Sequence, residues 1–379
     1  MHPGASSPSP ASGPGRGRRA ADGSPVHAPR PTMKDVAARA GVGLKTVSRV
    51  VNGEPGVLPG TAALVQQAID ELGFRRNDSA RQLRTGRTAG IGLVMEDVAD
   101  PFYSLLNGAV EEVARAHGSL VFTASSEDDP RRESELALAL CSRRVDGLIM
   151  VPAAEDHTYL LPEIDAGLAL VFADRPPVGL AADTVLVDNA EGARKGVAHL
   201  LAHGHRRIGY IGDSSRIYTS TERLSGYRRA MADAGAPVDE SWIALGPSDQ
   251  ARVGDALDHL LDPRREHPIT ALFTGNNRLT VAVLRELGER QRAQQVTGVP
   301  TPGGTPGLAL VGFDDFELAD LLTPAITVVA QDPAGLGRTS AQLLFARLEG
   351  DTSPPRRIVL PTVLVPRGSG ELPPPPDNA

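Results

Sequence analysis

The chain of 379 residues has one cysteine, Cys141, and lacks a long apolar run. A single cysteine excludes an intrachain disulfide and a thiolate metal cluster, and such usage is typical of the reducing cytoplasm. No apolar stretch approaches the roughly 18 residues that span a bilayer, which argues against a membrane protein. The arginines before Thr32 are not followed by an apolar stretch, so we expect no signal peptide and a cytoplasmic location.

Motifs typical of several enzyme classes are also missing. The sequence has no Gly-x-Gly-x-x-Gly after an apolar run, no Gly-x-x-x-x-Gly-Lys-Ser/Thr and no Gly-x-Ser-x-Gly. His199, His203 and His205 lie across a helix end and a glycine turn, with no cysteine or paired carboxylate nearby in the sequence. We therefore predict no catalytic residue, no cofactor and no metal.

Charge is distributed unevenly along the chain. Residues 1–88 hold 13 basic and 6 acidic residues, whereas the remainder holds 26 basic and 40 acidic residues. Phosphate contacts require local positive charge rather than a basic protein as a whole. A basic end on an acidic body fits a polyanion-binding module on a larger carrier, and it also fits a solvated charged surface.

Composition divides the chain into segments. Residues 1–30 are dominated by Pro, Gly, Ser and Ala and offer little to bury, so we predict a disordered tail. Residues 31–76 contain three short helical patterns separated by glycines, which indicates a compact all-helical unit. Residues 77–88 are assigned to a short helix and linker, residues 89–368 to an α/β body, and residues 369–379 to a second disordered tail.

Apolar runs alternate with amphipathic stretches throughout the α/β body. Runs of five or six residues suit strands that are buried on both faces, and helical patterns such as Pro101–His117 and Pro130–Arg144 lie between them. About 280 residues with this many strands favour two lobes built on parallel sheets, with a cleft between them. The predicted strands are residues 90–95, 119–124, 147–151, 168–173, 207–212, 271–275, 307–312 and 326–330.

The all-helical unit has the pattern of a helix-turn-helix. Thr32 is placed to cap the first helix, Asp35 stands at its third position, and Gly41 provides the left-handed turn that ends it. A second helix is predicted for residues 44–51, with three valines inward and polar side chains outward. The third helix begins near Pro59 and places on one side Leu64, Val65, Ala68, Ile69 and Leu72.

In a helix-turn-helix the second helix enters the major groove of DNA. Lys45 and Arg49 are suited to donate to guanine edges, and Thr46 and Ser48 are suited to bind phosphates. The helix pattern alone leaves open a helical module that binds a protein or binds nothing.

A dense series of motifs runs through the chain in order. It begins with TMKDVAARAGVGLKTVSRVVNG and AIDELGFRRNDSARQLRTGRTAGIGLVMEDVADPFY, and it continues as DGLIMVP, VFADRP, VDNAEGARKGVAHLLAHGHRRIGYIG, RLSGYRRAM, ALFTGNN, LALVGFDD and QDPAGLGRTSAQLL. With these motifs the chain resembles the lactose-repressor and galactose-repressor family of bacterial regulators over about residues 32–368. The resemblance implies a helix-turn-helix domain that binds DNA and a two-lobed body similar to periplasmic sugar-binding proteins.

The resemblance assigns DNA-binding roles to individual positions. It places Leu44, Lys45 and Arg49 at base edges. It places Thr46, Ser48 and Asn52 at the DNA backbone. Residues 77–84 resemble the family's hinge helix, in which an apolar wedge enters the minor groove when two subunits sit on an operator. Gly43 departs from the usual serine cap, which should weaken the start of the second helix by several tenths of a kcal/mol. The implied DNA-binding positions are Thr32, Leu44, Lys45, Thr46, Ser48, Arg49, Asn52, Asn77, Ala80 and the wedge, Leu83.

The resemblance also implies an effector site between the two lobes. Its positions fall at or just after predicted strand ends, where ligands gather in open α/β sheets. Carboxylates, an arginine and amides are suited to the hydroxyls of a sugar or nucleoside, and an aromatic ring offers a flat apolar face. Asn277 stands where the family commonly has Asp, so the family's carboxylate interaction at this pocket edge does not carry over to this chain. The implied effector positions are Phe102, Asp174, Arg223, Asn276, Asp314 and Gln331.

From these features we expect a homodimeric transcriptional repressor, associated with the nucleoid. A small effector would change lobe closure, alter the order of the hinge helix and so change the affinity for double-stranded operator DNA. A solute-binding transport protein would share the two-lobed body but not the helix-turn-helix. An enzyme on an α/β scaffold would need motifs that the sequence lacks.

Overall fold

The computed structural model describes residues 31–74, 88–246, 250–262, 264–297 and 308–375. They belong to two units, a helical one within residues 1–80 and an α/β one within residues 81–379. The predicted tail at residues 1–30 and the predicted hinge helix at residues 77–84 lie outside the described residues. Within the described part of the chain, no helix has the length and apolar character needed to cross a membrane.

Three helices build the helical unit around one small core: α1 (Met33–Ala40), α2 (Leu44–Val51) and α3 (Pro59–Leu72). Val36, Val47 and Val65 are completely buried in it. α1 and α3 both end at glycines in the left-handed region, Gly41 at φ +64° and Gly73 at φ +62°. The three predicted helices are therefore confirmed.

One prediction about the helical core is wrong. Leu64 was expected to face inward, but its side chain is 54% exposed. The small core contacts only a narrow stripe of α3, in which the side chains are spaced by three or four residues. That stripe consists of Val65, Ala68, Ile69 and Leu72.

The α/β unit contains two six-stranded sheets, with strand orders β11-β5-β4-β3-β1-β2 and β12-β10-β9-β8-β6-β7. Among the described strands, β10 and β12 pair antiparallel and the other neighbours pair parallel. The first sheet consists of β1 (Gly90–Met95), β2 (Leu120–Ser125), β3 (Gly147–Met150), β4 (Ala169–Ala173), β5 (Asp183–Val187) and β11 (Arg357–Leu360). The second consists of β6 (Ile208–Gly212), β7 (Ile243–Leu245), β8 (Ala271–Thr274), β9 (Ala309–Phe313), β10 (Thr327–Ala330) and β12 (Val363–Val365).

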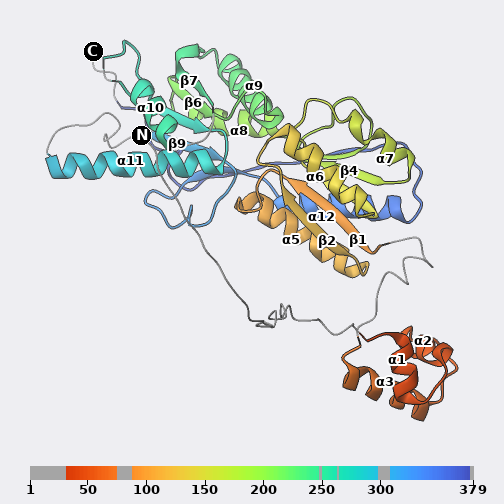
Figure 1. Cartoon of the computed structure of the whole chain (residues 1–379). Coiled ribbons are helices and arrows are strands. Elements are labelled where there is room, and N and C mark those ends of the chain that lie inside the picture. Colours follow the sequence, from red (N-terminus) through yellow and green to blue (C-terminus); the bar gives the residue numbers. More distant parts are fainter. Residues whose placement is uncertain (1–30, 75–87, 247–249, 263, 298–307, 376–379) are drawn as a thin grey trace, which may run out of the picture. The chain divides into compact units, whose positions relative to one another are not determined.

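Helices cover both faces of each sheet and so form two lobes (Figure 1). Lobe 1 is built on the first sheet and lobe 2 on the second. In lobe 1, α5 (Pro101–Ala116) and α12 (Pro333–Leu348) cover one face. α6 (Pro130–Ser142) and α7 (Leu161–Asp165), preceded by the 3-10 turn η1 (Thr158–Leu160), cover the other. In lobe 2, α8 (Asn189–Ala202) and α9 (Tyr218–Asp233) pack together on one face. α10 (Gln250–Leu260) and α11 (Asn277–Thr297) lie on the opposite face, and the turn η2 (Glu240–Trp242) precedes β7.

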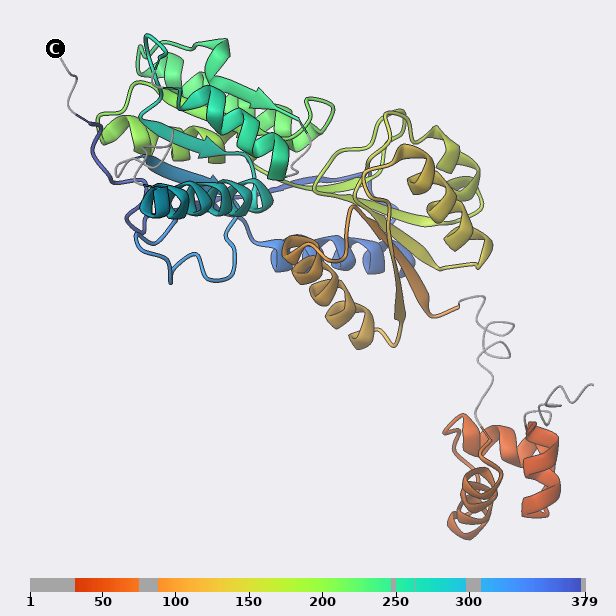
Figure 2. The same ribbon diagram turned by 60° about the vertical axis from the view of Figure 1, so that its left-hand side comes forward.

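The chain crosses between the lobes three times: after β5, between β10 and α12, and between β11 and β12. Figure 2 shows the result, with α12 in blue lying beside α5 in orange although they are far apart in the sequence. Each lobe is therefore assembled from separate stretches of sequence. The crossing segments meet at the cleft, which brings strand ends of both sheets to one place.

All eight predicted strands are present, within two residues at each end. β2, however, was expected to be buried on both faces, and Leu120 and Phe122 are exposed on it. It lies at the edge of its sheet, where no neighbouring strand covers it on one side. Four further strands were not predicted from the sequence: β5, β7, β11 and β12.

The predicted disordered tail from residue 369 is wrong for residues 369–375, which pack onto lobe 2. Ser369 is buried and donates from Oγ to the Leu310 carbonyl at 2.6 Å. The Glu371 carboxylate accepts from the hydroxyl of Thr327 at 2.9 Å. These residues are ordered because they bond polar groups at the edge of the sheet, although the composition of this segment is Pro-rich. Residues 376–379 lie outside the described part.

Candidate functional site

The α2 helix of the helical unit presents a polar face. Lys45 is exposed and Leu44 is 46% exposed, whereas Val47 is completely buried on the other side. Of the remaining predicted DNA-binding positions on this helix, Thr46, Ser48 and Arg49 are half-buried. The Asn52 side chain donates to Ser48 Oγ at 3.2 Å, so these two polar groups are held together. The arrangement offers short donors and two cations on one side of a helix.

The first two helices differ in how their starts are capped. The Asp35 carboxylate accepts from the backbone nitrogen and from Oγ1 of Thr32, both at 2.7 Å, and the hydroxyl bond lowers the pKa of Asp35. Gly43, at the start of α2, has extended backbone angles and no side chain to bond the first turn. This agrees with the weak cap that its sequence predicts. Asn77, Ala80 and Leu83 of the predicted hinge lie outside the described residues.

The six predicted effector positions meet in one cavity of the α/β unit, which encloses about 510 Å³ of empty space including open solvent. Both lobes contribute to its walls, because strand ends of both sheets point toward it. The lining residues are Glu96, Asp100, Phe102, Tyr103, Asp174, Arg175, Asp213, Ile217, Thr219, Ser220, Arg223, Gly275, Asn276, Asn277, Arg278, Asp314 and Gln331.

Arg223 forms the centre of the lobe 2 wall. It comes from α9, is 5% exposed, and its guanidinium lies 3.8 Å from the centroid of the Phe313 ring. Nε donates to Asn189 Oδ1 at 2.7 Å, and Nη1 donates to the Gly275 carbonyl at 2.6 Å. Nη1 also lies 3.4 Å from a carboxylate oxygen of Asp314. Four elements of lobe 2 are thus joined through one side chain.

Two aspartates enter the cavity from equivalent places in the two lobes. Asp174 directly follows β4 and Asp314 directly follows β9, with φ values of +66° and +67°. Few residues other than glycine adopt this left-handed conformation, and aspartate is among those that tolerate it. Burial raises the pKa of both carboxyl groups, and nearby arginines partly counteract it. The Gln331 amide donates to Asp314.

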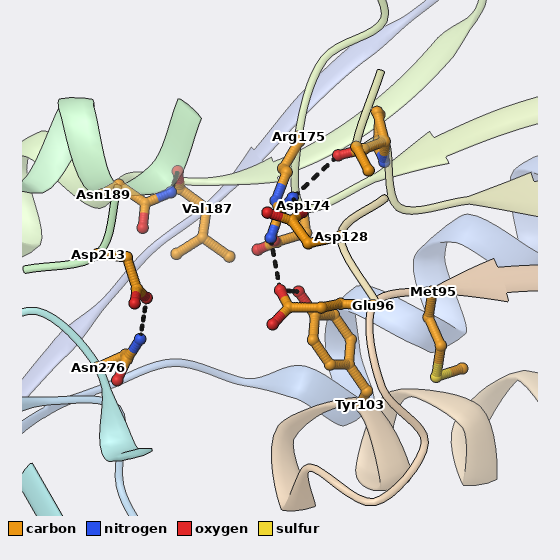
Figure 3. Close-up of polar contacts among 12 residues, drawn as sticks. Met95, Glu96, Tyr103, Asp128, Asp174, Arg175, Val187, Asn189, Asp213 and Asn276 are labelled. Atoms are coloured by element: carbon orange, nitrogen blue, oxygen red, sulfur yellow. Dashed lines mark hydrogen bonds and ion pairs between the residues drawn. The ribbon is translucent and has the colours of Figure 1, made fainter. Parts of the chain in front are cut away.

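Arg175 organises the lobe 1 wall and was not predicted from the sequence. Figure 3 shows it beside Asp174, reaching toward Glu96 and Asp128. Its Nη2 donates to Glu96 at 2.7 Å, and Nη1 donates to Asp128 and, at 3.1 Å, to the Pro152 carbonyl. Nε has no hydrogen-bond partner although it is buried. Three loops after strands are tied together by this one guanidinium.

Asn276 and Asp213 form a pair on the lobe 2 side, at the left of Figure 3. The Asn276 amide donates to the Asp213 carboxylate, and burial raises the pKa of that carboxyl group. Asn276 was predicted from the sequence, whereas Asp213, which directly follows β6, was not. The signal that could have found Asp213 was its place at a strand end, the same signal that marks Asp174 and Asp314.

The histidines that were considered for a metal site take structural roles. His205 contacts the Thr270 hydroxyl at 2.9 Å and the Leu372 carbonyl at 2.8 Å. His199 lies 2.7 Å from Glu371, a carboxylate that sequence proximity did not reveal. Within the described ranges, no group of three or more His, Cys, Asp or Glu side chains is arranged to hold a metal ion.

Two family models match the chain. Residues 32–77 match the bacterial regulatory proteins of the lacI family, and residues 197–370 match the periplasmic binding protein-like domain. The HTH-type transcriptional regulator CelR of Thermobifida fusca is 34% identical over 351 residues, which cover 90% of this chain and 98% of CelR. GalS of Salmonella typhimurium is 33% identical and covers 84% of this chain and 90% of its own length.

Solved structures agree with these matches. A complex of the transcriptional regulator CelR with cellobiose has a TM-score of 0.62 at 32% identity and covers 90% of this chain and all (100%) of that one. The Lac repressor dimer bound to operator and the anti-inducer ONPF shares the fold, with a TM-score of 0.75 at 24% identity over 91% of this chain and 100% of that one.

The two halves of the architecture correspond to the two matched models, and the relatives are matched over nearly their whole length. The chain therefore belongs to the lacI family of bacterial regulatory proteins, transcriptional regulators that combine a DNA-binding helix-turn-helix with a periplasmic-binding-protein-like effector domain.

Proposed function

We propose that the chain is a cytoplasmic repressor whose operator affinity is controlled by a neutral sugar or nucleoside bound in the cleft. The observation that carries this proposal is the convergence of carboxylates, guanidinium groups and amides from both lobes on one cavity. Such groups pair well with several hydroxyls at once, and Phe102 with Tyr103 provides an aromatic wall. The relative CelR has been solved with cellobiose, a neutral sugar.

The charge of the lining supports a neutral ligand. Carboxylates outnumber guanidinium groups around the cavity, and the guanidinium groups of Arg175 and Arg223 already bind carboxylates of the chain. Arg278 binds Glu96, so among the described lining residues each arginine already has a carboxylate partner. A phosphorylated or carboxylated ligand would bring further negative charge to these pairs, which is costly in a site of low dielectric. Neutral hydroxyl groups accept and donate hydrogen bonds here without that cost.

A thermal-shift panel tests the proposed ligand class. We expect one neutral mono- or disaccharide or nucleoside to stabilise the full-length protein by about 2.7 kcal/mol when present at 100 times its dissociation constant. The phosphorylated form of the same compound is the matched control and should give no shift. Stabilisation by phosphorylated compounds alone would contradict the proposal of a neutral effector.

We propose that α2 is the helix that reads the operator. In this proposal Leu44, Lys45 and Arg49 contact base edges. Thr46, Ser48 and Asn52 contact the sugar-phosphate backbone, and so does Thr32 at the capped start of α1. The exposure of Leu44 and Lys45 and the buried valine behind them support it. Asn77, Ala80 and Leu83 are proposed to form the hinge contacts, with Leu83 as the minor-groove wedge.

Lys45→Ala is expected to weaken binding to the operator by roughly 5- to 150-fold, equivalent to about 1–3 kcal/mol, because a base-edge contact is lost. It should also relax the preference among operator variants. Fluorescence anisotropy on the upstream DNA of the gene, across a salt series, measures both. Lys34→Ala, which removes an exposed cation of α1, is the comparison: it should weaken all DNA sequences equally. Equal behaviour of the two variants would contradict base reading by Lys45.

We further propose that the chain acts as a homodimer. Three leucines after β9 are exposed, with Leu318 at 57%, Leu321 at 72% and Leu322 at 41%. Close to the same loop, an apolar cavity is lined by Phe316 and by Val281 and Ala282 of α11. Exposed apolar groups gathered in this way are typical of protein interfaces. Sedimentation velocity of the full chain tests the dimer.

A further inference from the structure

Two polar contacts join the start of α11 in lobe 2 to lobe 1 across the cleft. Arg278 Nη1 donates to Glu96 Oε1 at 3.2 Å, and Asn277 Nδ2 donates to Asp100 Oδ1 at 3.3 Å. Glu96 directly follows β1 and Asp100 is the N-cap of α5, both in lobe 1. Asn277 and Arg278 are the first two residues of α11 in lobe 2. The start of one helix in each lobe therefore takes part in the contact.

Each lobe 1 partner is also held within its own lobe. Asp100 Oδ1 accepts from the Phe102 backbone nitrogen at 2.9 Å. The Glu96 carboxylate accepts from Arg175 at 2.7 Å and from the Tyr103 hydroxyl at 3.4 Å. Because these carboxylates are already oriented, little conformational freedom is lost when α11 reaches them. The two contacts thus connect rigid groups.

The two walls of the cavity differ in charge, so the cation and the amide donor of α11 are needed where the lobes meet. The lobe 1 wall carries Glu96, Asp100 and Asp174 against Arg175, whereas the lobe 2 wall carries two aspartates against two arginines. One of these arginines is Arg278, which therefore offsets the excess negative charge of lobe 1 when the lobes meet. The Asp100 carboxylate also lies at the amino end of α5 and near that of α11, where helix dipoles favour an anion.

We propose that the Glu96–Arg278 ion pair and the Asp100–Asn277 hydrogen bond form an interlobe latch that sets the equilibrium between closed and open lobes. The amide of Asn277 is essential to it, since an aspartate of the same shape would set a second carboxylate against Asp100. This inference goes beyond the proposed function, because the latch acts on lobe closure whatever the effector is.

Distances between spin labels in the full-length protein, without added sugar or nucleoside, test the latch. The labels are placed on exposed helix positions of the two lobes, at Glu135→Cys in α6 and Arg229→Cys in α9, with Cys141→Ser removing the native thiol. Asn277→Asp and Arg278→Met should each increase the population of longer distances roughly three- to tenfold, because each removes a charge-assisted contact.

A reciprocal exchange separates the latch from general damage. In Asp100→Asn with Asn277→Asp, the amide and the carboxylate change places, asparagine still caps α5, and the closed distances should return. Arg292→Met, an exposed arginine further along α11, is the matched control and should change nothing. The latch is overturned if Asn277→Asp and Arg278→Met leave the distances unchanged, if the exchange does not restore them, or if Arg292→Met has the same effect. Since no ligand is used, failure of the ligand panel does not affect this result.

Discussion

Replacing Arg223 by alanine is expected to abolish effector binding and to lower the free energy of unfolding of the α/β unit by about 3–5 kcal/mol. The guanidinium lies between Asn189, the Gly275 carbonyl and Asp314, and all three groups lose their contact with Arg223 together. The Asp314 carboxylate, which burial already makes harder to ionise, is left without its neighbouring cation.

The loss of Arg223 also has an expected pH dependence. Without the arginine, the pKa of Asp314 in the folded state rises further above that of the unfolded chain, so folding favours the protonated carboxyl. Stability is then retained at low pH and lost as pH rises through the folded-state pKa. The deficit relative to the parent protein should therefore shrink as the pH is lowered.

Chemical denaturation at several pH values and isothermal titration with the ligand identified in the panel measure these effects. Arg228→Ala, on the same helix, is the control: Arg228 makes an exposed ion pair with Glu240, and its loss should cost at most about 1 kcal/mol. If Arg223→Ala retained the affinity of the parent protein for the ligand, Arg223 would not belong to the effector site.

Gly226→Ala is expected to lower the free energy of unfolding by about 3 kcal/mol. A Cβ at this position of α9 would lie 2.1 Å from the carbonyl oxygen of Ala190 and 2.9 Å from Cβ of Ala193, both in α8. A backbone carbonyl in a helix cannot rotate away, so the two helices must separate. The helical preference of alanine over glycine recovers at most about 1 kcal/mol.

Separation of α8 and α9 should also reach the cleft. Arg223 precedes Gly226 by less than one turn of α9, and its partner Asn189 begins α8, so both ends of that hydrogen bond move. Thermal unfolding should show a midpoint roughly 6–12 °C lower, together with weaker effector binding. Ser225→Ala changes the exposed neighbouring position and should leave both unchanged. A variant at Gly226 as stable as the parent would show that the two helices are not in close contact.

Much of the fold could be predicted from local patterns because most strands are buried on both faces. Such strands appear as continuous apolar runs, as β3 and β4 do. The strands that were missed lack this signal: β7 and β12 have three residues each, and β11 alternates between exposed and half-buried positions. β5 contains an aspartate, Asp183, whose charge is paired with Arg347 in the folded protein.

The cleft was predicted only in part, for a different reason. Its six proposed effector positions followed from family resemblance, whereas Glu96, Asp128 and Arg175 were not anticipated. These three residues follow β1, β2 and β4, so their meeting depends on the order of strands in the sheet. Spacing along the sequence contains no information on that order.

The three crossings between the lobes have a consequence for how the protein is made. On the ribosome, β1 to β5 emerge before lobe 2, but α12 and β11, which complete lobe 1, are among the last elements to be synthesised. The apolar face that α12 covers, including Leu93 and Leu106, therefore waits for Leu336 and Leu344 to arrive. α8 to β10 are continuous in the sequence, so most of lobe 2 can assemble first. Lobe 1 thus begins before lobe 2 but lacks α12 and β11 until late in synthesis, and during that time its uncovered apolar face is the part of the α/β unit that needs protection from aggregation.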